Sequence, residues 1–84
     1  MKLAKVIGTV VATRKEETLV GFTLLVLEPL NEAGPHVVAV DTLGAGGGDT
    51  VLYVTGGAAR IVLRKPAPVD AAIVGIVDSV DLRP

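Results

Sequence analysis

Runs of β-branched residues, separated by clusters of glycine, proline and charged residues, constrain the fold of this chain more than any other feature. Valine is its commonest residue, and β-branched side chains suit the pleated, half-buried surface of a strand. The first run, Leu3–Thr13, places its odd-numbered residues on one face and its even-numbered residues on the other. This alternation predicts a strand, followed by a polar turn at residues 14–17.

Later runs in the chain have the same character. The expected strands are Gly21–Leu30, Val37–Leu43, Thr50–Val54 and Ala71–Asp81. The last of them is apolar on both faces, which predicts one face against the core and the other against a neighbouring subunit. Residues 55–61 predict a single helical turn with Thr55 as its N-cap.

The number and spacing of these runs indicate the architecture. Five short strands with turn signals between them predict a mainly all-β fold, a small and partly open β-barrel with one short helix. The sequence has 84 residues and shows no internal repeat, linker or low-complexity segment. We therefore expect a single domain over residues 1–84.

The chain is more apolar than a small soluble domain needs. Half of its residues are hydrophobic, only 20% are charged, and its mean hydropathy is +0.61. The longest apolar run, 71–77, is far below the ~20 residues of a membrane span. Lys5 and Thr9 interrupt the N-terminal apolar stretch, which argues against a signal peptide and favours the cytoplasm. We infer that the apolar excess lies in an interface between subunits.

A glycine-rich loop, Gly44-Ala45-Gly46-Gly47-Gly48, lies between the third and fourth expected strands. A phosphate-binding loop of the Walker type requires a lysine where this chain has Asp49. The dinucleotide fingerprint requires a sixth-position glycine and a following helix, whereas Asp49 and a strand follow here. The sequence therefore predicts a tight loop that needs positive φ or close packing of backbones.

Candidates for catalysis or metal binding are few. The chain has no cysteine, one serine (Ser79) and one histidine (His36), which stands beside a proline in an expected turn. The aspartates fall at strand ends and turns, where such side chains usually accept from backbone N–H groups. We expect no enzyme activity, no metal site and no cofactor. An enzyme that uses His36 with the aspartates stays open as an alternative. The aspartates are Asp41, Asp49, Asp70, Asp78 and Asp81.

A five-stranded barrel also raises the possibility of a module that binds nucleic acid or a small ligand. Oligonucleotide-binding folds stack bases on aromatic side chains along basic grooves. This chain offers only Phe22 and Tyr53 and has a net charge of −1. We expect neither nucleic acid nor membrane as a partner, and keep the binding module as the second hypothesis.

Five segments of the sequence, taken in order, resemble the corresponding segments of a known protein family. The chain resembles the bacterial microcompartment vertex proteins of the EutN/CcmL type, the pentameric family of carboxysome and ethanolamine-compartment vertex subunits. The resemblance covers nearly the whole length. The blocks that carry it are 5–15, 24–30, 38–41, 44–49 and 68–78.

The resemblance implies a five-stranded barrel of the oligonucleotide-binding type, without nucleic-acid binding. It implies a homopentamer that caps the vertices of a polyhedral shell, with hexameric and trimeric shell proteins as partners and no catalysis. On this basis we expect the loop Gly44, Ala45, Gly46, Gly47 and Gly48 to approach the five-fold axis. We expect Thr13, Arg14 and Lys15, a short polar and basic patch, to lie at the rim that faces the hexamers.

Overall fold

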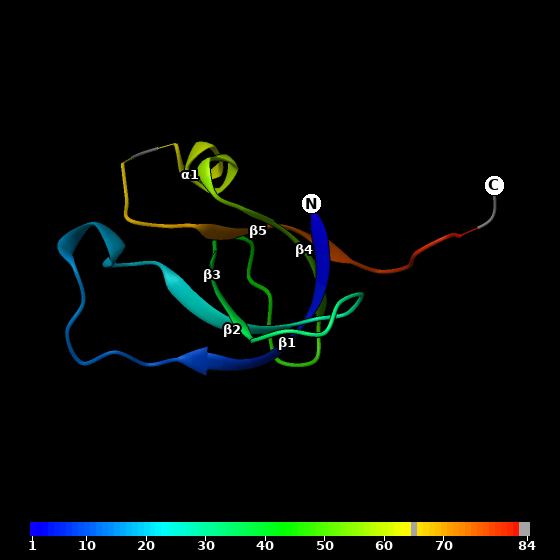
Figure 1. Ribbon diagram of the computed structural model, residues 1–84. Coiled ribbons are helices and arrows are strands. Elements are labelled where there is room, and N and C mark those ends of the chain that lie inside the picture. The colour runs from blue at the N-terminus through cyan, green and yellow to red at the C-terminus, as the bar shows by residue number, and fades with distance from the viewer. Residues whose placement is uncertain (65, 83–84) are drawn as a thin grey trace.

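The computed structural model describes residues 1–64 and 66–82, and its five strands form a closed barrel in the order β1-β2-β3-β5-β4 (Figure 1). The strands are β1 (Lys2–Val10), β2 (Thr23–Pro29), β3 (Val37–Asp41), β4 (Thr50–Thr55) and β5 (Ala71–Val77). The predicted mainly-β fold with one short helix is confirmed, but the barrel is closed and not partly open as expected. The single-domain prediction of 1–84 includes residues 65, 83 and 84, which lie outside the described residues.

Antiparallel pairing joins every neighbouring pair of strands except β3 and β5, which are parallel and meet through Val40 and Ala72. The register shifts once between β1 and β2, at Val6/Gly8, and once between β4 and β5, at Leu52/Tyr53. Such bulges bend a strand and increase its twist, which helps a short sheet to close on itself.

The barrel interior holds one hydrophobic cluster. Tyr53, Leu27 and Ile73 are among its largest side chains and are at most 1% exposed. The even-numbered residues of β1 supply Ala4 and Val6 to this cluster, as the alternation of the first strand predicts. The other buried members of the cluster are Leu25, Ala39, Val51 and Ala71.

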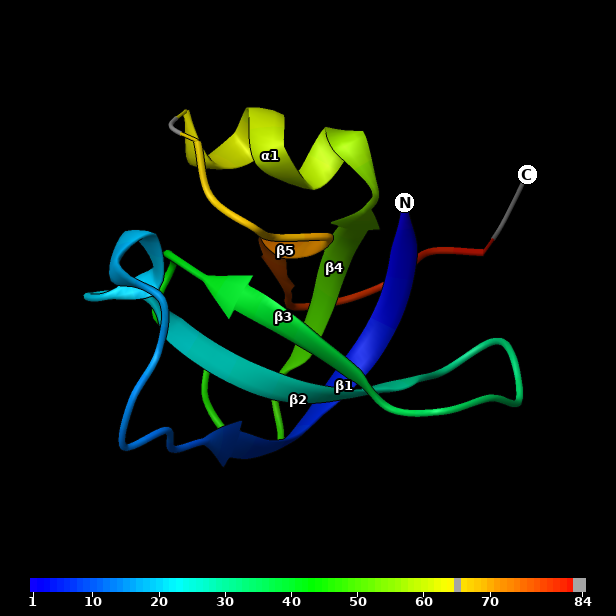
Figure 2. The ribbon, with the colours of Figure 1, turned by 60° about the vertical axis from the view of Figure 1, so that its left-hand side comes forward.

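A second cluster lies outside the barrel wall, under α1 (Gly57–Leu63). Figure 2 shows this helix across one end of the barrel, above β4 and β5. Ala59 of α1 packs here with Ala72 of β5, and Val74 lies against the same cluster. At Ala72, which is fully buried, the outer face of β5 therefore packs into the cluster that contains Ala59 of α1. The prediction that this face contacts a neighbouring subunit is wrong at this position.

The ends of all six predicted elements differ from the structure: β2 and β3 are shorter than expected, and β4 is longer by one residue, Thr55. Thr55 is not the N-cap of α1, because it still belongs to β4 and pairs with Ala71. Gly56, at φ 68°, is the N-cap instead, and its N–H donates to the carbonyl of Asp70 at 2.8 Å. The first and fifth strands end at Val10 and Val77, earlier than predicted.

Candidate functional site

The glycine-rich loop joins β3 to β4 and is held by the last residue of β3. Asp41 is only 6% exposed, and its carboxylate accepts from three successive backbone amides. The N–H of Leu43 donates to Oδ1 at 3.0 Å, and those of Gly44 and Ala45 donate to Oδ2 at 3.1 and 2.9 Å. One side chain thus fixes the entry to the loop.

The exit of the loop is fastened to β1. The N–H of Gly48 donates to the carbonyl of Val6, and the N–H of Val6 donates to the carbonyl of Asp49, each at 2.9 Å. Within the loop, the Gly46 N–H donates to the Asp49 carboxylate at 2.8 Å. The Asp49 N–H donates back to the Gly46 carbonyl at 3.0 Å. The loop is therefore a braced turn that has both ends tied to the barrel.

Two of the loop glycines are required by the backbone. Gly44 and Gly48 have φ values of +90° and +89°, which L-residues with a Cβ rarely adopt. Gly46 and Gly47 need no such conformation, and nothing within the subunit lies within 4 Å of where their Cβ atoms would be. Ala45, between Gly44 and Gly46, packs against the barrel core. The loop thus presents the Gly46–Gly47 backbone outward while its alanine packs inward.

This hydrogen bonding rules the loop out as a phosphate cradle. A phosphate loop needs several free N–H groups that converge on the anion. Here those N–H groups already donate to carboxylates or carbonyls within the subunit, and Asp49 adds negative charge. The engaged amides are those of Leu43, Gly44, Ala45, Gly46, Gly48 and Asp49.

The other candidates for chemistry are dispersed. His36 Nε2 lies 3.9 Å from Glu28 Oε2, and both side chains are 56% exposed, so they form only a solvated surface pair. Asp41 and Asp49 accept from backbone amides, as expected for aspartates at strand ends and turns. Across residues 1–64 and 66–82, no group of three His, Cys, Asp or Glu side chains could hold a metal ion.

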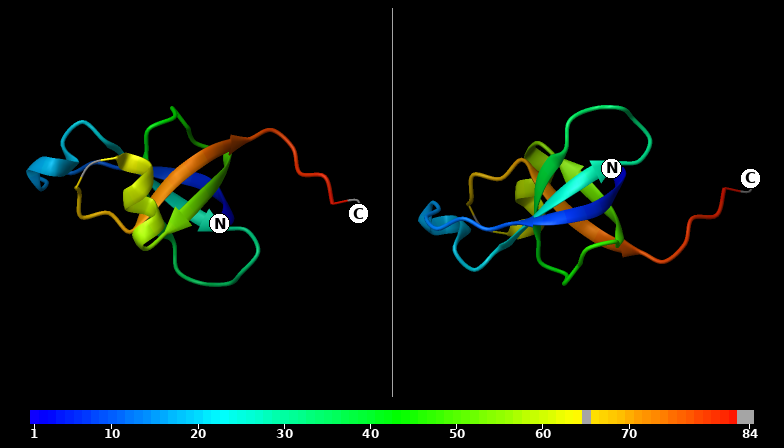
Figure 3. Two further views of the ribbon diagram at one scale, coloured as in Figure 1. Left: turned by 90° about the horizontal axis from the view of Figure 1, so that it is seen from above. Right: turned by 90° about the horizontal axis from the view of Figure 1, so that it is seen from below.

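The predicted basic patch lies away from the glycine loop. Thr13, Arg14 and Lys15 are exposed in the segment 11–22 that connects β1 to β2. Thr13 was expected at the end of the first strand but follows it by three residues. Lys15 Nζ donates to the carbonyl of Phe22 at 3.5 Å. Figure 3 shows this segment projecting from the end of the barrel opposite the C-terminus.

A one-turn 3-10 helix in the same segment, Glu17–Leu19, was not predicted from the sequence. The Glu16 carboxylate caps it and accepts from both the hydroxyl and the backbone N–H of Thr18. These two hydrogen bonds, that of the hydroxyl first, lower the pKa of Glu16. The spacing Glu-x-Thr before a leucine is the only sequence signal that would have located this turn.

Large apolar side chains remain exposed around the isolated subunit, in keeping with the excess read from the sequence. They are Met1, Ile7, Val11, Val20, Leu30, Val38, Leu43, Ile61, Ile76, Val80 and Leu82. Val11 and Leu82 are 91% and 89% exposed. Among the described residues, no helix has the length and apolar character to cross a bilayer.

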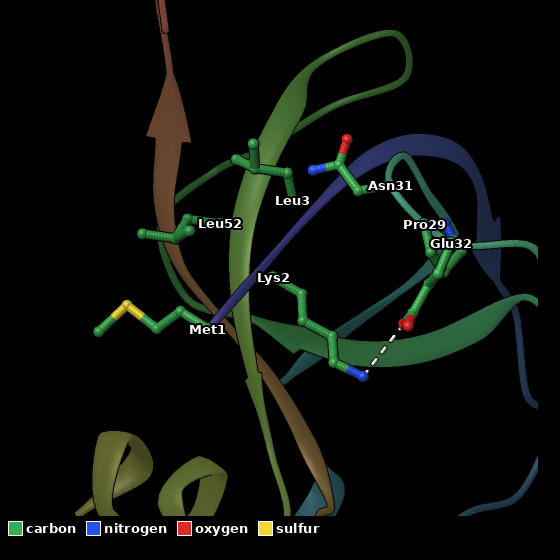
Figure 4. Close-up of a pocket in the computed structure, with 7 residues that line it drawn as sticks. All are labelled: Met1, Lys2, Leu3, Pro29, Asn31, Glu32 and Leu52. Atoms are coloured by element: carbon green, nitrogen blue, oxygen red, sulfur yellow. Dashed lines mark hydrogen bonds and ion pairs between the residues drawn. The ribbon is translucent and has the colours of Figure 1, made fainter. Parts of the chain in front are cut away.

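A feature that the sequence did not reveal is a groove at the start of β1. Met1, Lys2, Leu3, Pro29, Asn31, Glu32 and Leu52 line it (Figure 4). Lys2 Nζ donates to Glu32 Oε1 at 3.1 Å along one side, and this hydrogen bond and charge raise the pKa of Lys2. The lining comes from three separate segments of the chain, so no single motif announces it.

Comparison with known proteins gives a consistent assignment. Residues 1–78 match the family model described as ethanolamine utilisation protein EutN/carboxysome. The chain is 47% identical to the carboxysome shell vertex protein CcmL of Thermosynechococcus vestitus, over 95% of this chain and 86% of that protein. It is 49% identical to the bacterial microcompartment shell vertex protein GrpN of Rhodospirillum rubrum, over 96% and 97%. The solved pentameric GrpN shell protein superposes with a TM-score of 0.87 at 46% identity, over 99% of this chain and 100% of GrpN.

Proposed function

The chain belongs to the EutN/CcmL family, and we therefore propose that it is a structural shell protein. In this proposal it forms pentamers that occupy the vertices of a bacterial microcompartment in the cytoplasm. The observation that carries the proposal is the full-length likeness to a pentameric shell protein. In this role the chain gives the shell its five-fold corners and catalyses no reaction.

The surface of the subunit supports self-assembly. A soluble monomer exposes isolated large apolar side chains. This chain of 84 residues exposes many of them. A ring of five identical subunits uses heterologous contacts, in which one face of each subunit meets a different face of the next. Such a ring buries apolar area on two faces of every subunit. It also gives a sheet of hexamers a five-fold corner at which to close.

We place the loop 44–48 at the five-fold axis of this ring. Its support is a braced backbone that presents Gly46 and Gly47 without side chains, so that copies of the loop can approach closely. Replacing Gly46 by phenylalanine should impair pentamer formation or narrow the axial opening. Gly46→Ala is the matched control. Nothing within the subunit lies within 4 Å of a Cβ at this position, so Gly46→Ala should fold as the wild type does. An unchanged pentamer with an unchanged opening would refute the placement.

We place Thr13, Arg14 and Lys15 at the rim that contacts hexameric and trimeric shell proteins. The support is their exposure in a projecting segment and the concentration of basic charge there. Arg14→Asp should reduce closure of shells assembled with hexameric shell proteins, scored by electron microscopy. Arg60→Asp, which reverses an exposed charge on α1, is the control. Equal closure by both variants and the wild type would remove the rim role.

The proposal as a whole is tested by omission. Shell proteins assembled without this chain should give sheets, tubes or particles with open corners, and adding it should give closed polyhedra. Closed polyhedra in the absence of this chain would contradict the vertex function.

The alternative function, a module that binds a ligand or nucleic acid, has no specific observation in its favour. The groove at Met1 is small, and the chain has only two aromatic residues.

A further inference from the structure

Helix α1 is short, and its sequence gives it little stability of its own. It has seven residues, whereas isolated helices shorter than ~12–15 residues are marginal in water. Its N-cap is Gly56, which has no side chain to accept from the first amides of the helix. Gly57, a poor helix former, follows at the first helical position. The helix therefore depends on what it packs against.

The other end of α1 carries a backbone conformation that opposes the helix. Arg64 has φ 59° and ψ 19°, in the left-handed region where glycine is the usual residue. In this conformation its N–H donates to the carbonyl of Ile61 at 3.3 Å. Unwinding α1 releases Arg64 from the left-handed region, so the strain at this residue favours an open state.

The contact between α1 and the barrel is small. Ala59 is the one residue of the helix that is fully buried, while Val62 and Leu63 are partly buried. Ile61, the largest apolar alternative, is 77% exposed. Burial of apolar area is the main force that holds one element against another, and an alanine side chain supplies little of it.

The barrel does not need α1 in order to remain closed. Its interior cluster, which includes Leu27, Tyr53 and Ile73, contains no residue of the helix. The helix packs instead on the second cluster, outside the wall formed by β4 and β5 (Figure 2). The pairing that closes the barrel runs from strand to strand. Departure of α1 would therefore leave both the interior cluster and the strand pairing intact.

We propose that α1, together with Gly56 and Arg64, is a lid that opens from the outer wall while the barrel stays closed. Gly56 is the hinge, because its N–H is tied to the Asp70 carbonyl at 2.8 Å. The open state unwinds the helix and uncovers Ala72 of β5 and Val54 of β4, which are 0% and 9% exposed when the lid is shut. Opening thus gives the subunit a transient apolar surface. This inference concerns the single chain and does not rest on the proposed function.

Hydrogen exchange of the native protein, resolved by residue with NMR, tests the lid. The amides of Val62 and Leu63 should have protection factors at least about 100-fold lower than those of Val51 and Tyr53 in β4, because local opening requires less free energy than global unfolding. Low concentrations of urea should accelerate exchange in β4 and leave exchange in α1 unchanged, because local opening exposes little surface. Equal protection in α1 and β4, with the same dependence on urea, would overturn the lid.

Substitution of Arg64 tests the strained end independently. Arg64→Gly should raise the protection of the α1 amides about 3- to 10-fold, because glycine adopts a φ of 59° without strain. Arg64→Ala is the matched control, since it removes the same side chain but keeps the Cβ, and it should leave protection within about twofold of the wild type. Protection in β4 should not change in either variant. Equal effects of the two substitutions on α1, or equal changes in α1 and β4, would contradict the proposal.

Discussion

The carboxylate of Asp41 organises the glycine-rich loop, and its removal should be among the most damaging single changes outside the barrel core. Asp41→Ala leaves the N–H groups of Leu43, Gly44 and Ala45 without their acceptor. Asp41→Asn keeps one acceptor oxygen and puts an NH2 group in the place of the other. The isosteric variant should therefore retain part of the bracing, and the alanine variant none.

The cost follows from the number and exposure of these hydrogen bonds. A hydrogen bond to a charged group contributes about 1.5–3 kcal/mol when no water can replace the lost acceptor. Leu43 and Gly44 are exposed, so water replaces the carboxylate there, whereas Ala45 is half-buried. We therefore expect a total loss of about 2–4 kcal/mol for Asp41→Ala and roughly half of that for Asp41→Asn.

Thermal unfolding followed by circular dichroism measures this cost. For a domain of this size, 1 kcal/mol corresponds to about 4–8 °C in Tm, so Asp41→Ala should lower Tm by roughly 8–32 °C. All variants are compared at one protein concentration, because association raises the apparent stability. Asp49→Ala is the matched control. It removes a single exposed side-chain hydrogen bond, to Gly46, and should cost less than about 1 kcal/mol. If Asp41→Ala melted within about 3 °C of the wild type, the bracing role would be refuted.

Three further predictions follow from local geometry. Gly44→Ala should destabilise the protein by about 1–2 kcal/mol, because φ is +90° there, whereas Gly46→Ala should leave subunit stability unchanged in the same melting assay. Leu27→Ala should cost about 2–5 kcal/mol in urea unfolding, because Leu27 is fully buried in the barrel core and a cavity would remain. The pKa of Glu16 is lowered in the folded protein, so its bonds to Thr18 stabilise the 3-10 turn above the unfolded pKa and are lost as pH falls through the folded pKa. The Thr18 amide resonance should follow that titration by NMR, and an amide shift that did not change at acidic pH would contradict it.

Strand existence was predictable from residue types, but strand length was decided by the partner strand. The first run was expected to continue to Thr13, yet the last pair between β1 and β2 is Val10 with Leu24. The fifth run was expected to reach Asp81, but its last partner is Thr50, where β4 begins. Residues beyond these points keep their propensity for strand and lack a neighbouring ladder to join.

The glycine loop shows a similar division. Its sequence excluded a phosphate site and indicated positive φ, which Gly44 and Gly48 adopt. The role of Asp41 required the structure, because any aspartate at a strand end can accept from nearby amides and only the path of the loop decides which ones. The groove around Leu3 and Leu52 was beyond prediction, since β4 must pair with β1 before these side chains meet.

The outer face of β5 illustrates an ambiguity of apolar pattern. Both faces of this strand are hydrophobic, which indicates that both are covered and does not say by what. Ala72 is covered by the cluster that includes α1 of the same chain, a helix whose glycine-rich start weakened its signal in the sequence. Val11, Val80 and Leu82 stay exposed in the single subunit and are available to a neighbouring one.

The native mass of the purified protein, measured by native mass spectrometry or light scattering, tests the central claim most directly. The vertex function predicts a single species at five times the subunit mass of 8.6 kDa. A stable monomer at 8.6 kDa, soluble despite its exposed apolar side chains, would contradict the claim that this chain builds a five-fold corner.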